Sequence, residues 1–132
     1  MMSTTNLRAL LQTLLAVLLL ASCALAQGIK TKRGAVVLYG SVASCSQPAT
    51  INYKKVQRAT PEWKEIKSDG VRKGTARYDL LISAMNTRIK SAVQSAAQSE
   101  SRDCVVRKGD IKDKGGLDVA DLTDAVITEV ES

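Results

Sequence analysis

The sequence of 132 residues contains no histidine and no phenylalanine, and its aromatic residues are one tryptophan and three tyrosines. The absence of histidine excludes nucleophile systems that need an imidazole base, imidazole metal ligands and histidine pH switches. The shortage of large aromatic side chains leaves Val, Ile, Leu and Ala to form the core. A domain of roughly 100 residues with such a core usually needs a crosslink or an oligomer interface for ordinary stability.

Other catalytic chemistry is also missing from the sequence. No Ser or Cys lies beside a plausible base, and no pair of carboxylates falls on one predicted rigid element. The spacing of Asp110 and Asp113 does not match an EF-hand calcium loop, and two cysteines without histidine fall short of a zinc site. We therefore predict a protein that is not an enzyme and that uses no metal or cofactor.

Positive and negative charges are segregated along the chain. Residues 30–114 hold 18 Lys and Arg against 8 Asp and Glu, whereas residues 115–132 hold five acids and no base. The body therefore presents a cationic surface, and the acidic segment either folds back on it or marks an opposite face.

Residues 1–26 have the form of a secretory signal peptide. Arg8 precedes a short apolar run at 14–21, and Ala24–Ala26 supplies the small residues of an A-x-A cleavage site. This run is too short to read as a spanning helix. We favour cleavage after Ala26, which predicts a periplasmic or secreted protein. The alternative is a lipoprotein anchored through Cys23, because Leu20-Ala21-Ser22-Cys23 resembles a bacterial lipobox.

Export would leave Cys45 and Cys104 in an oxidising compartment. An even pair of cysteines there favours a disulfide, and two buried free thiols are the alternative. Closing a loop of this length would stabilise the fold by roughly 4 kcal/mol in the chain-entropy model.

The segment 75–98 lacks Gly and Pro and has strict helical periodicity. Its apolar residues follow one another at the alternating spacings of four and three that are typical of a coiled-coil seam. Either this helix is a core helix of a small domain, or it packs against helices of other copies in an oligomer. The seam consists of Tyr78, Ile82, Met85, Ile89, Ala92 and Ala96.

A second helix is predicted before the seam helix. Thr60, Pro61 and Glu62 have the residue types of an N-cap, a first helical position and a first turn. Gly70 and Gly74 favour a reversal over one long helix, because two glycines cost about 2 kcal/mol in a helix interior.

Short strands and a final helix account for the remaining segments. A loop is predicted at 41–50, and the final helix has Thr123 as its cap with a hydrophobic staple between Leu122 and Ile127. Strands are predicted at 35–40, 50–56, 104–107 and 117–120. The predicted fold class is α+β, with a small antiparallel β body, a short helical arm at about 61–101 and a C-terminal helix.

Two segments resemble the Skp/OmpH family of periplasmic chaperones. TINYKKVQRATPEWKEI, from Thr50, resembles the opening strand and the S/T-P-E helix start of that family. IKSAVQSAAQSESRDCVVRKGDI and LDVADLTDAVITEV resemble its returning helix, two-stranded hairpin and terminal helix. The resemblance covers residues 50–131 and leaves residues 27–49, an N-terminal extension, outside the family pattern, as it does the cysteine pair.

The resemblance implies a homotrimer with a β body and helical arms that hold unfolded outer-membrane proteins without ATP. The arm here is shorter than the family pattern, so a shallow binding surface is expected in place of a deep cage. The predicted client contacts lie near the arm tip. They are Trp63, Ile66 and Tyr78 with the bases Lys64, Lys67, Arg72, Lys73 and Arg77.

Two other functions compete with this holdase hypothesis. One is a structural envelope protein that oligomerises through the seam and contacts lipid head groups or the cell wall. The other is nucleic-acid binding, which is suggested by charge alone. Export, the acidic C-terminal segment and the lack of aromatic stacking platforms argue against nucleic acid as a partner.

Overall fold

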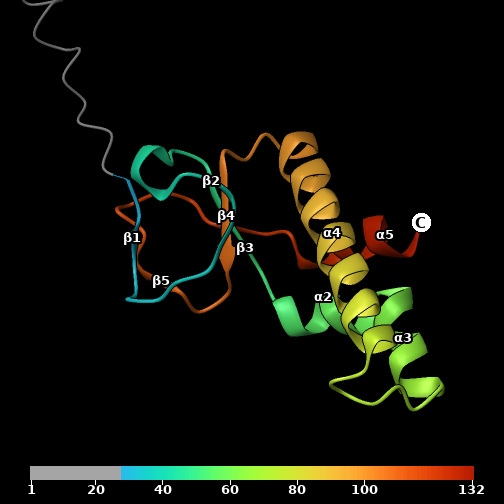
Figure 1. Ribbon diagram of the computed structural model, residues 1–132. Coiled ribbons are helices and arrows are strands. Elements are labelled where there is room, and N and C mark those ends of the chain that lie inside the picture. Colours follow the sequence, from blue (N-terminus) through green and yellow to red (C-terminus); the bar gives the residue numbers. More distant parts are fainter. Residues whose placement is uncertain (1–27) are drawn as a thin grey trace, which may run out of the picture.

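The computed structural model describes residues 28–132 and has helices on one side of a small β body (Figure 1). The signal peptide, the cleavage site after Ala26 and Cys23 lie outside the described residues. In chain order the elements are β1 (Lys30–Thr31), β2 (Val37–Gly40), the 3-10 helix η1 (Val42–Ser44), β3 (Pro48–Ile51), α2 (Tyr53–Ala59), α3 (Pro61–Ser68), α4 (Ala76–Ser99), β4 (Cys104–Arg107), β5 (Ile111–Asp113), β6 (Ala120–Asp121) and α5 (Thr123–Glu131).

The predicted α+β class is confirmed, but the main sheet is mixed and not purely antiparallel. Its strand order is β2-β4-β3-β6, and a separate two-stranded ribbon joins β1 to β5. β3 runs parallel to both β4 and β6, whereas β2 runs antiparallel to β4. The parallel pairing arises because the helices after β3 carry the chain back across the sheet before β4 begins.

The predicted strand at 50–56 is wrong in its second half. β3 ends at Ile51, and Asn52 begins a helix there, because its side-chain oxygen accepts a hydrogen bond from the backbone N–H of Lys55 at 3.2 Å. All four residues of β3 are buried, as expected for a central strand between two parallel neighbours. The predicted loop at 41–50 is correspondingly shorter, and the proposed boundary between residues 49 and 50 falls inside β3.

The predicted reversal between the two helices is confirmed. The Thr60 hydroxyl accepts a hydrogen bond from the N–H of Trp63 at the start of α3, and Thr75 does the same for Tyr78 at the start of α4. The connecting residues 69–75, called the hairpin loop below, include Gly70 and Gly74 at positive φ. α3 and α4 therefore form a helical hairpin.

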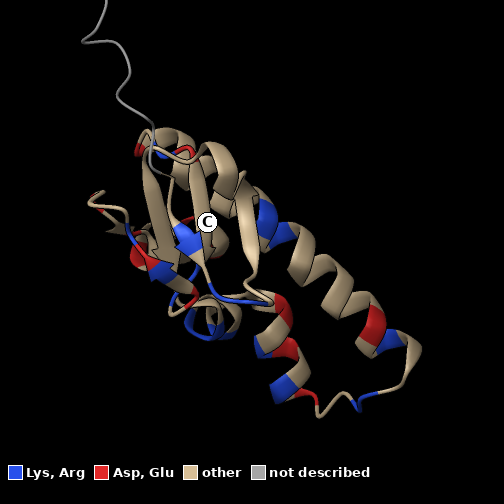
Figure 2. Cartoon of the chain, turned by 90° about the vertical axis from the view of Figure 1, so that its left-hand side faces the viewer, with Lys and Arg blue, Asp and Glu red and all other residues tan. Residues whose placement is uncertain are grey.

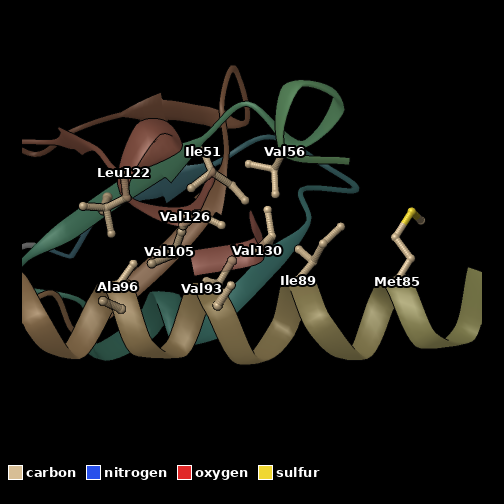
Figure 3. Close-up of a cluster of buried hydrophobic side chains, with 13 residues drawn as sticks. Ile51, Val56, Met85, Ile89, Val93, Ala96, Val105, Leu122, Val126 and Val130 are labelled. Atoms are coloured by element: carbon tan, nitrogen blue, oxygen red, sulfur yellow. The ribbon is translucent and has the colours of Figure 1, made fainter. Parts of the chain in front are cut away.

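The C-terminal half of the α4 seam belongs to the core of the single chain. Met85, Ile89, Ala92 and Ala96 are buried and pack with residues of β3, α2 and α5 (Figure 3). The core-helix interpretation is confirmed for these four residues. Tyr78 and Ile82, at the hairpin end, are only half-buried.

The final helix begins one residue earlier than predicted: Thr123 is its first helical residue, and the N-cap position is Leu122, which has no side-chain cap. The Asp121 carboxylate accepts hydrogen bonds from the N–H and the hydroxyl of Thr123. The Thr123 hydroxyl accepts one from the N–H of Asn52 at 2.9 Å. Thr123 therefore joins the start of α5 to the start of α2. The last strand is β6, which begins at the end of the predicted segment 117–120.

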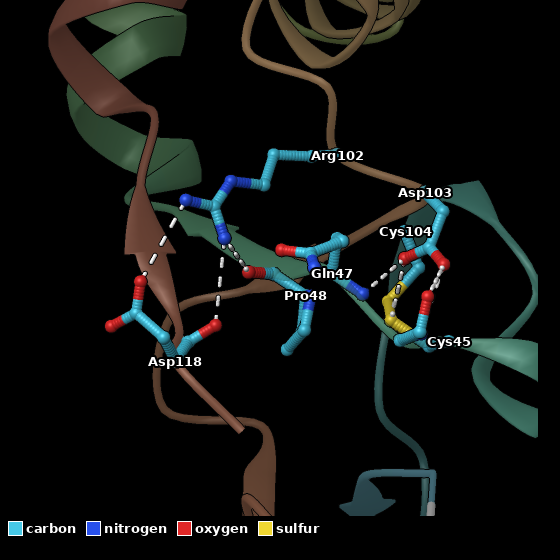
Figure 4. Close-up of a disulfide and its surroundings, with 8 residues drawn as sticks. Cys45, Gln47, Pro48, Arg102, Asp103, Cys104 and Asp118 are labelled. Carbon is cyan, nitrogen blue, oxygen red and sulfur yellow. Dashed lines mark hydrogen bonds and ion pairs between the residues drawn. A yellow bond between two sulfur atoms is a disulfide. The ribbon is translucent and has the colours of Figure 1, made fainter. Parts of the chain in front are cut away.

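The predicted disulfide between Cys45 and Cys104 is present, with 5.7 Å between the Cα atoms. Both residues belong to a second, smaller cluster in which Ile29 and Val106 are buried. The Asp103 carboxylate accepts hydrogen bonds from the N–H groups of Ser46 and Gln47, each at 2.8 Å (Figure 4). Disulfide and carboxylate together attach the N-terminal extension to the start of β4.

Burial opposes ionisation of the Asp103 carboxyl, yet its pKa lies below the usual value. The hydrogen bonds from Ser46 and Gln47 favour the charged form and outweigh the loss of hydration. The carboxylate is therefore ionised at neutral pH, in the form that accepts all of these bonds.

Substitution of Gly40 by alanine is expected to destabilise the fold by about 2–3 kcal/mol. Gly40 has a φ of +71°, and a Cβ there would overlap the carbonyl oxygen of Asp103. Gly34→Ala is the matched control, because Gly34 has a φ of +77° with no atom within 4 Å of its Cβ position. The control should cost about 1 kcal/mol. Thermal unfolding measures both, and equal losses would contradict the close contact at Gly40.

Candidate interaction surface at the end of the helical hairpin

The predicted client contacts all come from the helical hairpin. α3 carries Trp63, Lys64, Ile66 and Lys67, the hairpin loop carries Arg72 and Lys73, and α4 carries Arg77 and Tyr78. The loop projects from the end of the hairpin, away from the strands (Figures 1 and 2). The fold therefore brings these residues to one end of the molecule.

The three apolar candidates are not equally accessible. Ile66 is 5% exposed, so it is a core residue of the hairpin and its predicted role as a surface contact is wrong. Trp63 and Tyr78 are half-buried, and Trp63 packs against the main core. The accessible apolar surface here is therefore smaller than the sequence predicted.

Two of the five candidate bases form ion pairs within the described residues. Arg77 Nη2 lies 2.8 Å from Glu65 Oε1 and 2.6 Å from Asp69 Oδ2, and the Lys64 ammonium lies 3.3 Å from Glu131. The hydrogen bonds to Glu65 and Asp69 raise the pKa of Arg77, and the bond from Arg77 lowers the pKa of Asp69. Arg77 therefore links α3 to α4 and is not free to attract a ligand.

Three bases remain available near the loop. The Lys67 ammonium lies 5.1 Å from the centroid of the Trp63 ring, a cation–π distance. Arg72 and Lys73 are exposed and form no ion pair with any residue from 28 to 132. The hairpin loop therefore carries two positive charges that no ion pair within residues 28–132 compensates.

An open groove beside α4 was not predicted from the sequence. Its volume is about 690 Å³, and the ends of α3 and α5 contribute Glu62 and Glu129 to its walls. Leu80, at the end near the hairpin loop, is 71% exposed. Leu80 lies between the seam residues Tyr78 and Ile82 and is not part of the seam. Its spacing of four residues from Ala84 was the only sequence feature that indicated a second apolar face on this helix. The α4 side of the groove is formed by Leu80, Ser83, Ala84, Thr87, Arg88, Ser91, Ala92 and Ser95.

The acidic segment folds back on the cationic body, which is one of the two predicted arrangements. Four of its five acids form ion pairs with bases of the body. The pairs are Asp118 with Arg102 at 3.7 Å, Asp121 with Lys108 at 2.9 Å, Asp124 with Lys55 at 3.0 Å and Glu131 with Lys64 at 3.3 Å. Each partly exposed pair contributes little alone, on the order of 0.5 kcal/mol. Together they neutralise four bases of the body.

The ionised Asp121 side chain is expected to stabilise the fold at neutral pH. Bonds from Thr123 and then from Lys108 lower its pKa to about 2. The contribution is therefore complete above the unfolded pKa near 4 and is lost as the pH falls through about 2. Because this side chain is half exposed, solvent screening reduces the expected contribution to about 1 kcal/mol.

Asp121→Asn tests this contribution, since it keeps an acceptor oxygen and removes the charge. The variant should be less stable than the wild type in urea at pH 7, and the two stabilities should converge toward pH 2. If the free energies of unfolding of the two proteins differ by the same amount at pH 7 and pH 2, the charge of Asp121 is not the cause of the difference.

The described residues contain one cluster with the donor atoms of a metal site, formed by Cys45, Asp103 and Cys104. The two sulfur atoms are bonded to each other in the disulfide and are not available as thiolate ligands.

No helix between residues 28 and 132 combines the length and the apolar character needed to cross a membrane. No family model, curated protein or solved structure matches this chain.

Proposed function

We propose that the protein is an exported, ATP-independent holdase of the Skp/OmpH type that binds unfolded outer-membrane proteins. The observation that carries the proposal is the helical hairpin inserted between β3 and β4, with uncompensated bases in its loop. The order of strand, capped helix, returning helix and terminal helix supports the proposal. The structure departs from the resemblance where residues 53–59 form α2, and where β4 and β5 lie in different sheets and do not pair as the implied two-stranded hairpin. The proposed location is the periplasm, after cleavage near Ala26.

The proposed client surface keeps only some of the contact residues that the sequence predicted. Arg72 and Lys73 supply free positive charge, while Trp63, Tyr78 and the exposed Leu80 supply nearby apolar surface. A cationic loop next to apolar side chains favours acidic, unfolded chains through charge attraction followed by apolar contact. α3 has 8 residues and α4 has 24, so the paired part of the hairpin is short and the proposed surface is shallow.

Suppression of aggregation tests the proposal. An unfolded outer-membrane β-barrel protein is diluted from urea into buffer with the mature chain 27–132, and turbidity is recorded against holdase concentration. Arg72→Ser with Lys73→Ser should raise the half-maximal concentration several-fold at low salt, and the difference should shrink as salt screens the charges.

A matched control removes two bases elsewhere. Lys54 and Arg58 on α2 are exposed and form no ion pair within residues 28–132. Lys54→Ser with Arg58→Ser should leave suppression unchanged. Equal losses of aggregation suppression in the two double variants would mean that only the net charge of the protein matters. A wild-type chain that does not suppress aggregation would overturn the holdase proposal.

The proposed homotrimer has its own test, which is the solution mass of the mature chain by light scattering under non-reducing conditions. A mass three times that of the chain supports the trimer. A stable monomer removes the trimer from the proposal and leaves a small disulfide-crosslinked binding domain.

The alternative of a structural envelope protein is less favoured. It requires the helical seam as its oligomer interface, but four of the six seam residues are already buried within the chain. This alternative also includes contact with lipid head groups. That contact does not depend on the seam, and residues of the β1–β5 ribbon could supply it.

A further inference from the structure

A second cationic surface lies on the β1–β5 ribbon, far from the hairpin loop (Figure 1). Five exposed bases project from these two strands and the residues that follow them. None of the five forms an ion pair with any residue from 28 to 132. This surface, called the basic ribbon, consists of Lys30, Lys32, Arg33, Lys112 and Lys114. Figure 2 turns this side of the molecule toward the viewer.

Two acids lie near the basic ribbon, and they offset only part of its charge. Asp110 pairs with Arg107 at 3.1 Å and accepts a hydrogen bond from the N–H of Val36. Asp113 lies opposite Lys30 in the strand register, and its carboxylate accepts a bond from the N–H of Gly115 at 2.9 Å. Elsewhere on the body, carboxylates of the acidic segment neutralise bases. The ribbon therefore retains a net positive charge that the fold does not compensate.

A hollow next to the ribbon adds an apolar component. It has a volume of about 610 Å³ and is lined by Lys112, Asp113 and Lys114 together with Ile111, Leu117 and Val119. Two ammonium groups against one carboxylate, beside three partly buried apolar side chains, match a ligand with an anionic head and an apolar body. An anionic phospholipid has this chemistry, whereas a free inorganic anion would make no use of Ile111, Leu117 and Val119.

The position of the ribbon in the chain favours a membrane surface as the partner. β1 begins at Lys30, only a few residues after both candidate processing sites. Lys30 lies seven positions after Cys23, and a fully extended chain of that length spans at most about 25 Å. A chain that is still uncleaved, or one lipidated at Cys23, would therefore hold the ribbon close to the bilayer.

We propose that the basic ribbon docks on the surface of a bilayer that contains anionic phospholipids. The residues of β1 belong to the N-terminal extension, whereas Lys112 and Lys114 lie within the range 50–131 that the family resemblance covers. The inference rests on the proposed export of the chain and not on client holding. Each base near an anionic bilayer strengthens binding by about fivefold.

Vesicle co-sedimentation of the mature chain 27–132 tests the inference without any unfolded client. The probe is vesicles of equal parts phosphatidylglycerol and phosphatidylcholine, compared with phosphatidylcholine alone. The wild type should bind only the anionic vesicles, and added salt should release it. Lys112→Ser with Lys114→Ser should lower the partition coefficient by at least about tenfold.

Two further variants separate charge position from net charge and from folding. Lys112→Arg with Lys114→Arg should retain binding, because it keeps both charges. Lys54→Ser with Arg58→Ser should stay within about twofold of the wild type, since those bases lie on α2. Equal binding to both kinds of vesicle, or equal losses in the ribbon and α2 variants, would overturn the proposal.

Competition identifies the source of the bound anion. Inorganic phosphate at low millimolar concentration, with ionic strength held constant, should not displace the chain from the vesicles. Displacement under those conditions would overturn the assignment to a bilayer in favour of a free-phosphate site. A failed aggregation assay would leave the vesicle result unchanged, so the two proposals fail independently.

Discussion

Replacement of Ile89 by aspartate is expected to unfold the domain. Ile89 is 1% exposed and lies in the main cluster, among buried residues of β3, α2 and α5. Loss of the apolar side chain alone costs about 2–5 kcal/mol. A buried carboxylate without a partner adds several more, and the total reaches the whole stability of an ordinary small domain, about 5–15 kcal/mol. The far-UV circular dichroism of the variant should be that of an unfolded chain at 25 °C.

The matched control is Leu80→Asp on the same helix. Leu80 is 71% exposed, so its substitution should change the stability by no more than about 0.5 kcal/mol. Ile82→Asp should fall between the two, because Ile82 is half-buried. A folded Ile89→Asp variant with reduced solution mass would instead support a seam that faces other copies of the chain.

Removal of the disulfide is expected to produce the second largest effect. The two cysteines are separated by 59 residues, and the chain-entropy model assigns about 4 kcal/mol to a loop of this length. Cys45→Ala with Cys104→Ala should therefore shift the midpoint of urea unfolding strongly to lower concentration. Alanine is preferred to serine because both positions are buried, and an unpaired hydroxyl there would add its own cost.

Limited proteolysis shows where this stability is lost. The extension is held to β4 by the disulfide, the Asp103 hydrogen bonds and the small cluster around Ile29. In the alanine variant, cleavage after Lys30, Lys32 or Arg33 should become faster than cleavage in the hairpin loop. The wild type treated with a reducing agent should behave in the same way. An unchanged urea midpoint in both would mean that the noncovalent contacts suffice.

The helix boundaries were the most predictable part of the fold. Thr60 and Thr75 cap their helices with side chains that contact residues only three positions away, so neighbouring residues carry the information. The strand predicted at 50–56 failed for a related reason. Residues 51–56 were predicted to alternate as in a half-buried strand, with Ile51, Tyr53 and Lys55 on one face. Asn52 is an equally good helix cap, however, and the buried β3 shows no alternation.

The candidate interaction surface was only partly predictable. The sequence places eight candidate residues near the arm tip, but it does not show that Glu65 and Asp69 engage Arg77 or that Ile66 faces inward. The basic ribbon is less visible still, because Lys30 and Lys112 are far apart in the chain. Only the pairing of β1 with β5 brings them together.

Local features of the sequence by themselves determined the capped helices, the reversal at the glycines, the cysteine pair and the excess of positive charge. Each depends on residue types within a few positions or on composition. The tertiary structure alone decided that the seam is buried within one chain and that the sheet is mixed. It also decided which charges remain uncompensated. These properties depend on which distant segments pack together, because burial and ion pairing are set by contacts across the fold and not by sequence neighbours.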